Sequence, residues 1–166
     1  ILPTFRTITY DDALALYGSD KPDLRGDWVI ETVSRTGDLV EEKISFPSDL
    51  VSQNIIREFE SNTLEGTVSK SMKTNGKMHE FTAIRSLRAH VGLTQLGKTR
   101  LSLINSLDLP YRMDQFLWVR DFPLFYQSPS GQIQSMHHPF TAPLSEHVDI
   151  MKNDPLAARA HHYDLV

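Results

Sequence analysis

Histidines are the residues of this sequence best suited to chemistry near neutral pH. The seven histidines include two adjacent pairs, His137–His138 and His161–His162. Imidazole binds metal ions and hydrogen-bonds small anions. However, the sequence has no cysteine, and neighbours on a strand point to opposite faces, so one pair cannot easily supply two metal ligands. We expect no metal site within this chain. At the first pair we expect a hydrogen bond either to a small anionic ligand or to the neighbouring backbone.

A second candidate for chemistry is a phosphate-binding loop. Residues 92–99 read Gly-Leu-Thr-Gln-Leu-Gly-Lys-Thr, which fits the pattern of that loop completely. The function requires a strand that leads into the loop and a parallel sheet around it, but residues 86–90 are a poor core strand. We expect instead a helix over 93–107 in which Leu96, Leu103 and Leu107 line one stripe. Lys98 and Arg100 should lie on the solvent side of this helix. A P-loop nucleotide hydrolase remains the weaker alternative.

The acidic residues and the composition argue against several other classes. The carboxylates of Asp121, Asp149, Asp154 and Asp164 are dispersed, and no nucleophile motif occurs, so we assign no catalytic residue. The net charge of −4 lacks the basic footprint of a complete tRNA-binding surface. No apolar run approaches the roughly 20 residues of a membrane span, so we expect no membrane partner.

The segments around the first histidine pair are expected to form an antiparallel hairpin. Residues 116–126 are strongly apolar and aromatic, the Ser-Pro-Ser-Gly sequence at 128–131 favours a turn, and residues 132–138 form the returning strand. Pro139 lacks an amide donor and ends the ladder. One of the two histidines should therefore face the surface of the hairpin that the other does not.

The N-terminal half favours a small α+β module preceded by a short helix. Thr9 is a good N-cap for a helix over 10–17 that Gly18 ends, and a loop follows up to residue 26. Between residues 27 and 90, β-rich and amphipathic segments alternate. In this part we expect strands at 28–33, 39–46 and 81–87, a helix over 49–60 that Ser48 caps, and a polar turn at 69–77.

Three segments together resemble bacterial-type aspartyl-tRNA synthetases, including the mitochondrial ones. They are Leu-Tyr-Gly-Ser-Asp-Lys-Pro-Asp-Leu-Arg at 16–25, Phe-Leu-Trp-Val-Arg-Asp-Phe-Pro-Leu-Phe at 116–125 and Met-His-His-Pro-Phe-Thr-Ala-Pro at 136–143. The resemblance implies an internal fragment of a larger enzyme. It also implies an α+β fold in which a small insertion domain, 27–90, is flanked by parts of an antiparallel class II catalytic sheet, 1–26 and 91–166.

The resemblance further implies the activity of the full-length enzyme. That enzyme would be a homodimer that activates aspartate with ATP and Mg2+ and then charges tRNA(Asp). By resemblance, His137 contacts the aspartate, and His138 supports His137 without touching the substrate. Asp164, in the Tyr-Asp-Leu-Val segment, would lie near the magnesium and the ATP phosphates, a role that suits a carboxylate. The location would be mitochondrial or the bacterial cytoplasm, and the short, divergent segment 27–90 favours mitochondria.

The same resemblance predicts that these 166 residues alone are inactive and hold no cofactor. The ATP-clamping arginine motifs, the aspartate-recognition loop and the glycine-rich segment of the family are absent from the sequence, as is the anticodon-binding barrel. Catalysis requires such groups to be held together in close geometry. A stand-alone interaction module that reuses the insertion fold remains the alternative from a different class of function.

Overall fold

The computed structural model describes residues 5–89, 91–107, 109, 115–128 and 130–166. The chain divides into two compact units. One unit consists of Ile1–Asp12 together with Phe116–Val166, and the other of Ala13–Gln115. Helices and mainly antiparallel strands occur together in this structure, which confirms the α+β fold class predicted from the sequence. No helix in the described residues is long and apolar enough to cross a membrane.

Helix α1 (Tyr10–Tyr17) begins and ends as its sequence predicts. The Thr9 hydroxyl accepts a hydrogen bond from the Asp12 amide at 3.1 Å and donates one to the Asp12 carboxylate at 2.8 Å. These bonds satisfy an amide that the first helical turn leaves without a partner. At the other end, the Gly18 amide donates to the Leu14 carbonyl at 3.0 Å, and Gly18 has a φ of +68° that favours glycine.

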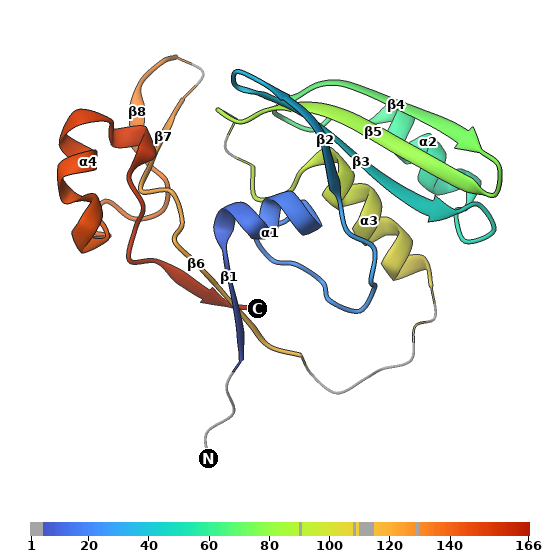
Figure 1. Ribbon diagram of the computed structural model, residues 1–166, viewed down its shortest axis with the longest axis horizontal. Coiled ribbons are helices and arrows are strands. Elements are labelled where there is room, and N and C mark those ends of the chain that lie inside the picture. The colour runs from blue at the N-terminus through green and yellow to red at the C-terminus, as the bar shows by residue number, and fades with distance from the viewer. Residues whose placement is uncertain (1–4, 90, 108, 110–114, 129) are drawn as a thin grey trace. The chain divides into compact units, whose positions relative to one another are not determined.

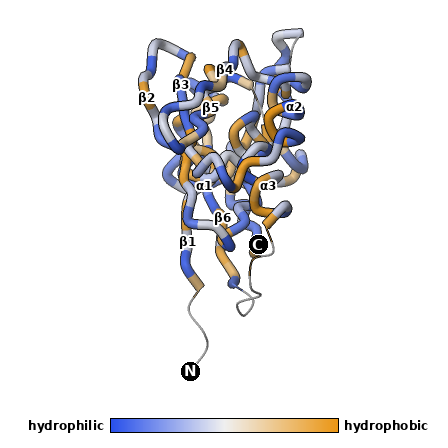
Figure 2. Tube along the Cα trace, turned by 90° about the vertical axis from the view of Figure 1, so that its right-hand side faces the viewer, coloured by the Kyte–Doolittle hydropathy of each residue, from blue (hydrophilic) through white to orange (hydrophobic). Residues whose placement is uncertain are grey.

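The unit Ala13–Gln115 is built on a four-stranded antiparallel sheet with the strand order β2-β3-β5-β4 (Figure 1). Its strands are β2 (Glu31–Thr36), β3 (Leu39–Pro47), β4 (Thr67–Asn75) and β5 (Met78–Ser86). Two helices, α2 (Gln53–Ser61) and α3 (Gln95–Ser106), share one apolar core with the sheet. Figure 2 shows apolar stretches of α3 in orange. The core includes Ile44, Phe46, Phe81, Ile55, Phe59, Leu96 and Leu103, so both helices cover the same face of the sheet.

Three local predictions for this unit are wrong. Residues 69–77 belong largely to strand β4 rather than to a turn, because their polar side chains suit an edge strand with one solvated face. Strand β2 begins at Glu31, since the Ile30 amide already donates to the Leu16 carbonyl outside the sheet. Helix α2 begins at Gln53, with Ser52 rather than Ser48 at its N-cap position.

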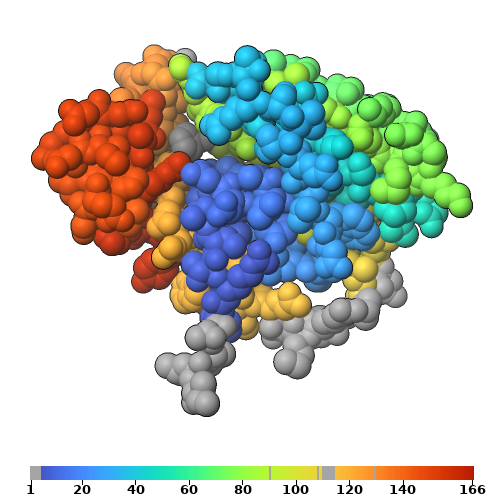
Figure 3. Space-filling model, viewed as in Figure 1, coloured from blue at the N-terminus to red at the C-terminus, as the bar shows by residue number. Residues whose placement is uncertain are grey.

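The second unit contains a three-stranded sheet of order β1-β6-β9 and a separate hairpin, β7-β8. Its strands are β1 (Arg6–Thr9), β6 (Leu117–Arg120), β7 (Phe125–Gln127), β8 (Ile133–Ser135) and β9 (Tyr163–Leu165). Strand β6 pairs in parallel with β1 and antiparallel with β9. Between β8 and β9 lie the short helices η1 (Ser145–His147), α4 (Val148–Asn153) and η2 (Pro155–Ala157). Figure 3 shows this C-terminal part, in red, as a closely packed group of atoms.

The predicted hairpin is present, but its strands are much shorter than expected. The continuous strand over 116–126 is wrong, because Asp121 has a φ of +60° and breaks the chain between β6 and β7. An aspartate is one of the few non-glycine residues that enter this region readily. The returning strand β8 ends at Ser135, so both histidines lie beyond it. Pro129 of the predicted turn lies outside the described residues.

The predicted domain boundaries at 26/27 and 90/91 remain a prediction. The compact units divide at different positions, 12/13 and 115/116. Helix α3 belongs to the same unit as the four-stranded sheet because it contributes Leu96 and Leu103 to the core beneath that sheet. Both leucines belong to the helical stripe expected from the sequence, so the stripe predicted the buried face of α3 without identifying what covers it.

Candidate functional site

Two histidine rings form the centre of the candidate site. His137 and His162 stack with their ring centroids 4.1 Å apart and their planes at 5° to each other. Phe122, which is fully buried, meets both rings edge-on, with centroid distances of 5.2 Å to His137 and 4.6 Å to His162. Edge-to-face contacts of this kind are favourable because of the aromatic quadrupole. The buried phenyl ring therefore supports both imidazoles.

Backbone hydrogen bonds bring these three rings together. The Phe122 carbonyl accepts from the Ala160 amide at 2.8 Å, and the Leu124 amide donates to the Ala158 carbonyl at 2.9 Å. On its other side, the Leu124 carbonyl accepts from the Met136 amide at 3.0 Å. The segment after the Asp121 break thus lies between the chain that carries His137 and the chain that leads to β9.

Asp164 completes the cluster from strand β9. Its backbone is paired with Val119 of β6, which fixes the point from which the Asp164 side chain extends. The Nε2 atom of His162 lies 3.3 Å from the Oδ1 atom of Asp164. The structure therefore brings together His137 and Asp164, two residues that the resemblance assigned to different substrates, and places His162 in contact with each of them.

The surroundings of His137 favour its neutral form. Burial of one side of the ring lowers the pKa of His137 below its ordinary value, and the nearby His162 and His138 act in the same direction, whereas the Asp164 carboxylate opposes them. The side chain as a whole still reaches solvent. One ring face is covered by His162, but the residue as a whole is exposed, so a neutral imidazole N–H can donate to a small ligand.

His138 turns to a different neighbour. Its ring stacks on Phe140 with a centroid distance of 5.1 Å and an interplanar angle of 2°. Both residues are exposed, and Phe140 retains 83% of its accessible surface. The expectation that the two histidines point in different directions agrees with these contacts, although a bend rather than a strand separates them.

Within the described part of the chain, no group of three or more His, Asp or Glu side chains has the arrangement needed to hold a metal ion by itself. Asp164 could supply one oxygen ligand to Mg2+, an ion that commonly uses one or two carboxylates together with substrate phosphates. The residues present thus fit a contribution to a magnesium–nucleotide site, whose remaining ligands would come from the substrate or from elsewhere.

The stretch that matches a phosphate-binding loop has a structural role. The Thr94 hydroxyl caps α3 by accepting from the Gly97 amide at 3.1 Å, and Lys98 forms an ion pair with Glu58 at 3.1 Å. A Cβ atom at Gly97 would lie only 2.1 Å from the carbonyl oxygen of Gly18. The second glycine of the pattern is therefore required by close packing of two backbone segments.

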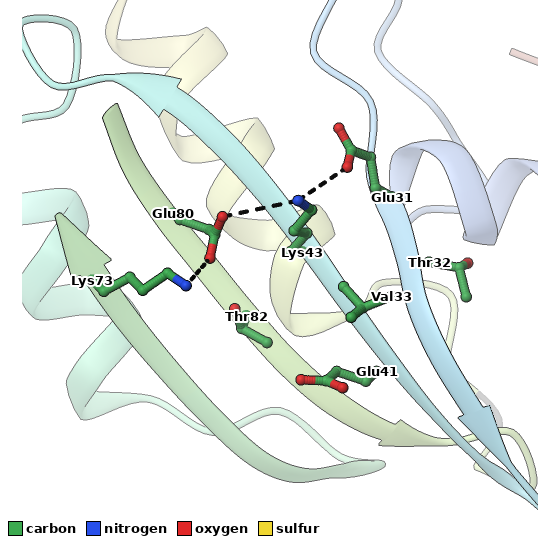
Figure 4. A pocket seen from close by; sticks show the side chains of 8 residues that line it. All are labelled: Glu31, Thr32, Val33, Glu41, Lys43, Lys73, Glu80 and Thr82. Atoms are coloured by element: carbon green, nitrogen blue, oxygen red, sulfur yellow. Dashed lines mark ion pairs between the residues drawn. The ribbon is translucent and has the colours of Figure 1, made fainter. Parts of the chain in front are cut away.

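A groove of about 440 Å3 lies on the outer face of the four-stranded sheet (Figure 4). Lys43 lies between Glu31 at 3.3 Å and Glu80 at 3.9 Å, and Lys73 contacts Glu80 at 2.8 Å. Glu41 accepts a hydrogen bond from Ser34, so its carboxylate is also engaged. Because these charged groups pair with one another, we assign the groove no ligand.

Comparison with known proteins identifies the class to which this fold and site belong. The family of class II tRNA synthetases specific for D, K and N matches residues 1–166, and the chain belongs to this family. The sequence-based resemblance is thereby confirmed at the level of the family. Similar curated proteins are the aspartate–tRNA(Asp/Asn) ligase of Salinibacter ruber, 29% identical, and the mitochondrial aspartate–tRNA ligase of Schizosaccharomyces pombe, 30% identical. The aspartate–tRNA(Asp/Asn) ligase of Nitratidesulfovibrio vulgaris is 31% identical.

These alignments cover 98% of this chain but only 33–34% of each relative. The chain thus spans about a third of the length of the relatives it matches. The aligned region is 213 residues long for the Salinibacter protein, whereas this chain has 166 residues. The relatives therefore carry residues within the matched region that this chain lacks.

Sequence reasoning did not assign a role to His162. It named His161 and His162 only as an adjacent pair, and placed only His137, His138 and Asp164 near substrates. One signal was available, because His162 and Asp164 are two positions apart and the same face of a strand repeats every second residue. The contact with His137 depends on a segment more than 20 residues away and had no local signal.

Proposed function

We propose that this chain is part of an aspartate–tRNA ligase, which activates aspartate with ATP and Mg2+ and transfers it to tRNA(Asp). The observation that carries the proposal is the family match over all 166 residues, together with relatives that are aspartate–tRNA ligases. The contact chain from His137 through His162 to Asp164 supports it, since an anion-binding imidazole and a metal-binding carboxylate lie within one cluster.

In the proposed reaction, His137 binds and orients the aspartate. Its neutral imidazole can donate one hydrogen bond to a carboxylate without placing a positive charge beside His162. Asp164 provides an oxygen ligand on the side of the ATP phosphates, and bound magnesium would reduce their negative charge. His138 acts indirectly, and its stacking on Phe140 supports a role in holding the bend that follows His137.

The remaining features of the complete enzyme are also proposals. We assign residues 27–90 to an insertion domain, and the position of all four strands of the antiparallel sheet within this range supports the assignment. The complete protein is proposed to be a homodimer. Its location is proposed to be mitochondrial or the bacterial cytoplasm, since similar proteins include bacterial and mitochondrial ligases. The isolated chain is proposed to be inactive, because it would offer the nucleotide only part of a binding site.

Replacing His137 with alanine should impair aspartate use far more than ATP use. The imidazole donor is lost, and a hydrogen bond to a charged group is worth about 1.5–3 kcal/mol, or roughly tenfold to a hundredfold. The change is measured by aspartate-dependent ATP–pyrophosphate exchange in the complete ligase, with the KM for aspartate and the KM for ATP determined separately. His137→Gln, which keeps an amide donor, should recover part of the loss.

Two outcomes would contradict this assignment of His137. An equal rise in both KM values would mean that the residue does not discriminate between the substrates. A cooperative loss of folding at physiological temperature would show instead that the ring is needed mainly for its contacts with Phe122 and His162.

Replacing Lys98 with alanine should leave the same exchange activity within a few-fold of the wild type. The ammonium group is held by Glu58 on α2 and is partly exposed, so its loss costs at most about 1 kcal/mol. A loss of roughly a hundredfold, or about 2.7 kcal/mol of transition-state stabilisation, would show that the glycine-rich stretch binds phosphate after all. Glu58→Gln serves as a control that breaks the same ion pair from the other side.

A further inference from the structure

We propose that His162 is a positioning residue that joins the two ligand positions of the site: its ring face orients His137 toward aspartate, and its Nε2 atom orients the Asp164 carboxylate toward the magnesium–nucleotide. This inference rests on the function proposed above. It adds a residue to which neither the family nor the relatives' names assign a role. His162 is the one described residue that the structure shows in contact with both His137 and Asp164.

The ring face of His162 restricts the orientation of His137. His162 covers one side of the His137 ring in a nearly parallel stack, and fully buried Phe122 meets the edge of that stack. An exposed histidine ordinarily samples several rotamers. In this cluster, a shift of the His137 ring away from the stack would abandon its contacts with both neighbours. The ring of His137 is therefore held in one orientation before a ligand arrives, which reduces the entropy lost on binding.

The Nε2 atom of His162 restricts the orientation of the Asp164 carboxylate. It lies 3.3 Å from one carboxylate oxygen of Asp164, and the Asp164 backbone is fixed by its pairing with Val119. The remaining freedom of Asp164 lies mainly in rotation of its side chain. A contact with one oxygen restricts that rotation, and a metal site needs oxygen ligands at defined distances. The side chains of His162 and Asp164 are both partly buried, so water competes only in part for this contact.

Three substitutions in the complete ligase separate these two effects. His162→Phe keeps an aromatic face but has no nitrogen, so the KM for magnesium–ATP should rise about tenfold while the KM for aspartate changes little. His162→Gln keeps an amide donor but no ring, so the KM for aspartate should rise about threefold to tenfold with a smaller effect on magnesium–ATP. His162→Ala should raise both constants.

His161→Ala is the matched control, because it removes an exposed histidine from the adjacent position. It should leave both constants unchanged. Thermal unfolding of every variant is measured in parallel. If His162→Ala does not fold, the opposite effects of His162→Phe and His162→Gln on the two KM values still test the proposal. If neither of these two variants folds, His162 is a structural residue and the proposal is wrong.

Two results with folded variants also overturn the proposal. One is a parallel change of both KM values in His162→Phe and His162→Gln, and the other is no change in either variant. A wrong ligase assignment can be distinguished from a wrong role for His162, because only the former would be seen as missing activity in the unmodified protein. A complete wild-type protein without aspartate-dependent exchange would refute the ligase assignment before any variant is made. An active wild type with an unsplit response refutes only the role of His162.

Discussion

Replacing Gly97 with alanine should destabilise the unit Ala13–Gln115 by about 3 kcal/mol or more, the upper range for overpacking. Gly97 lies inside α3, where alanine would ordinarily stabilise an exposed helix by about 1 kcal/mol. The added Cβ atom would lie 2.1 Å from the Gly18 oxygen and 2.5 Å from its carbonyl carbon. Both neighbours are backbone atoms, so no side-chain rotation can relieve the clash. The steric term should therefore reverse the sign expected from helix propensity.

Denaturant unfolding followed by the fluorescence of Trp28 measures this effect. Trp28 packs against the core of that unit, and a Trp118→Phe background leaves it as the single tryptophan. Gly76→Ala is the control, because Gly76 has a positive φ, unlike the helical Gly97, but no atom lies within 4 Å of its added Cβ. That change should cost only about 1 kcal/mol. A Gly97→Ala protein as stable as the wild type would show that the two segments separate easily.

Replacing Arg100 with methionine should cost about 3 kcal/mol. Arg100 is fully buried, and its guanidinium donates to the Trp28 carbonyl at 2.6 Å and to the Gly26 carbonyl at 2.7 Å. Burial lowers the pKa of Arg100 from its ordinary value, and the charges of Asp23 and Tyr17 oppose this shift. Methionine would fill similar space but leave both carbonyls without their charged donor, and each such loss costs about 1–3 kcal/mol.

Arg100→Lys should rescue this loss poorly, because a single ammonium group cannot reproduce the two-pronged geometry of guanidinium. Arg25→Met is the control, from the loop that carries the Gly26 and Trp28 carbonyls. Its side chain is half exposed and pairs with Asp23 at 2.6 Å, so its loss should cost less than about 1 kcal/mol. The Trp28 signal again reports unfolding. Equal midpoints for the Arg100→Met and Arg25→Met proteins would mean that the buried guanidinium contributes little.

The burial of Arg100 could not be predicted from the sequence. The helix over 93–107 and its leucine stripe were predicted from local periodicity, and they are present. The side chain of Arg100 was expected in solvent, and this expectation is wrong. Its carbonyl partners lie more than 70 residues earlier in the chain, so no local pattern could show that they would cover the arginine.

The candidate site was predictable to a similar extent. The motifs pointed to His137 and Asp164 one at a time, and their substrate contacts remain predictions. Strand alternation could have placed His162 beside Asp164, but not beside His137. The break at Asp121, which sets the path of Phe122, depends on one backbone angle that tertiary contacts impose on an otherwise strand-like sequence. Local chemistry identified the participants, and long-range packing determined their arrangement.

The single phenyl ring of Phe122 has a consequence for how this site can diverge. Because it touches both His137 and His162, and these also touch each other, the three positions share their contacts. Substitutions in such a group do not have additive effects. A change at Phe122 alters the contacts of both histidines. Replacing one histidine can therefore have no effect on activity in one relative and abolish activity in another. We expect positions 122, 137 and 162 to covary across the family.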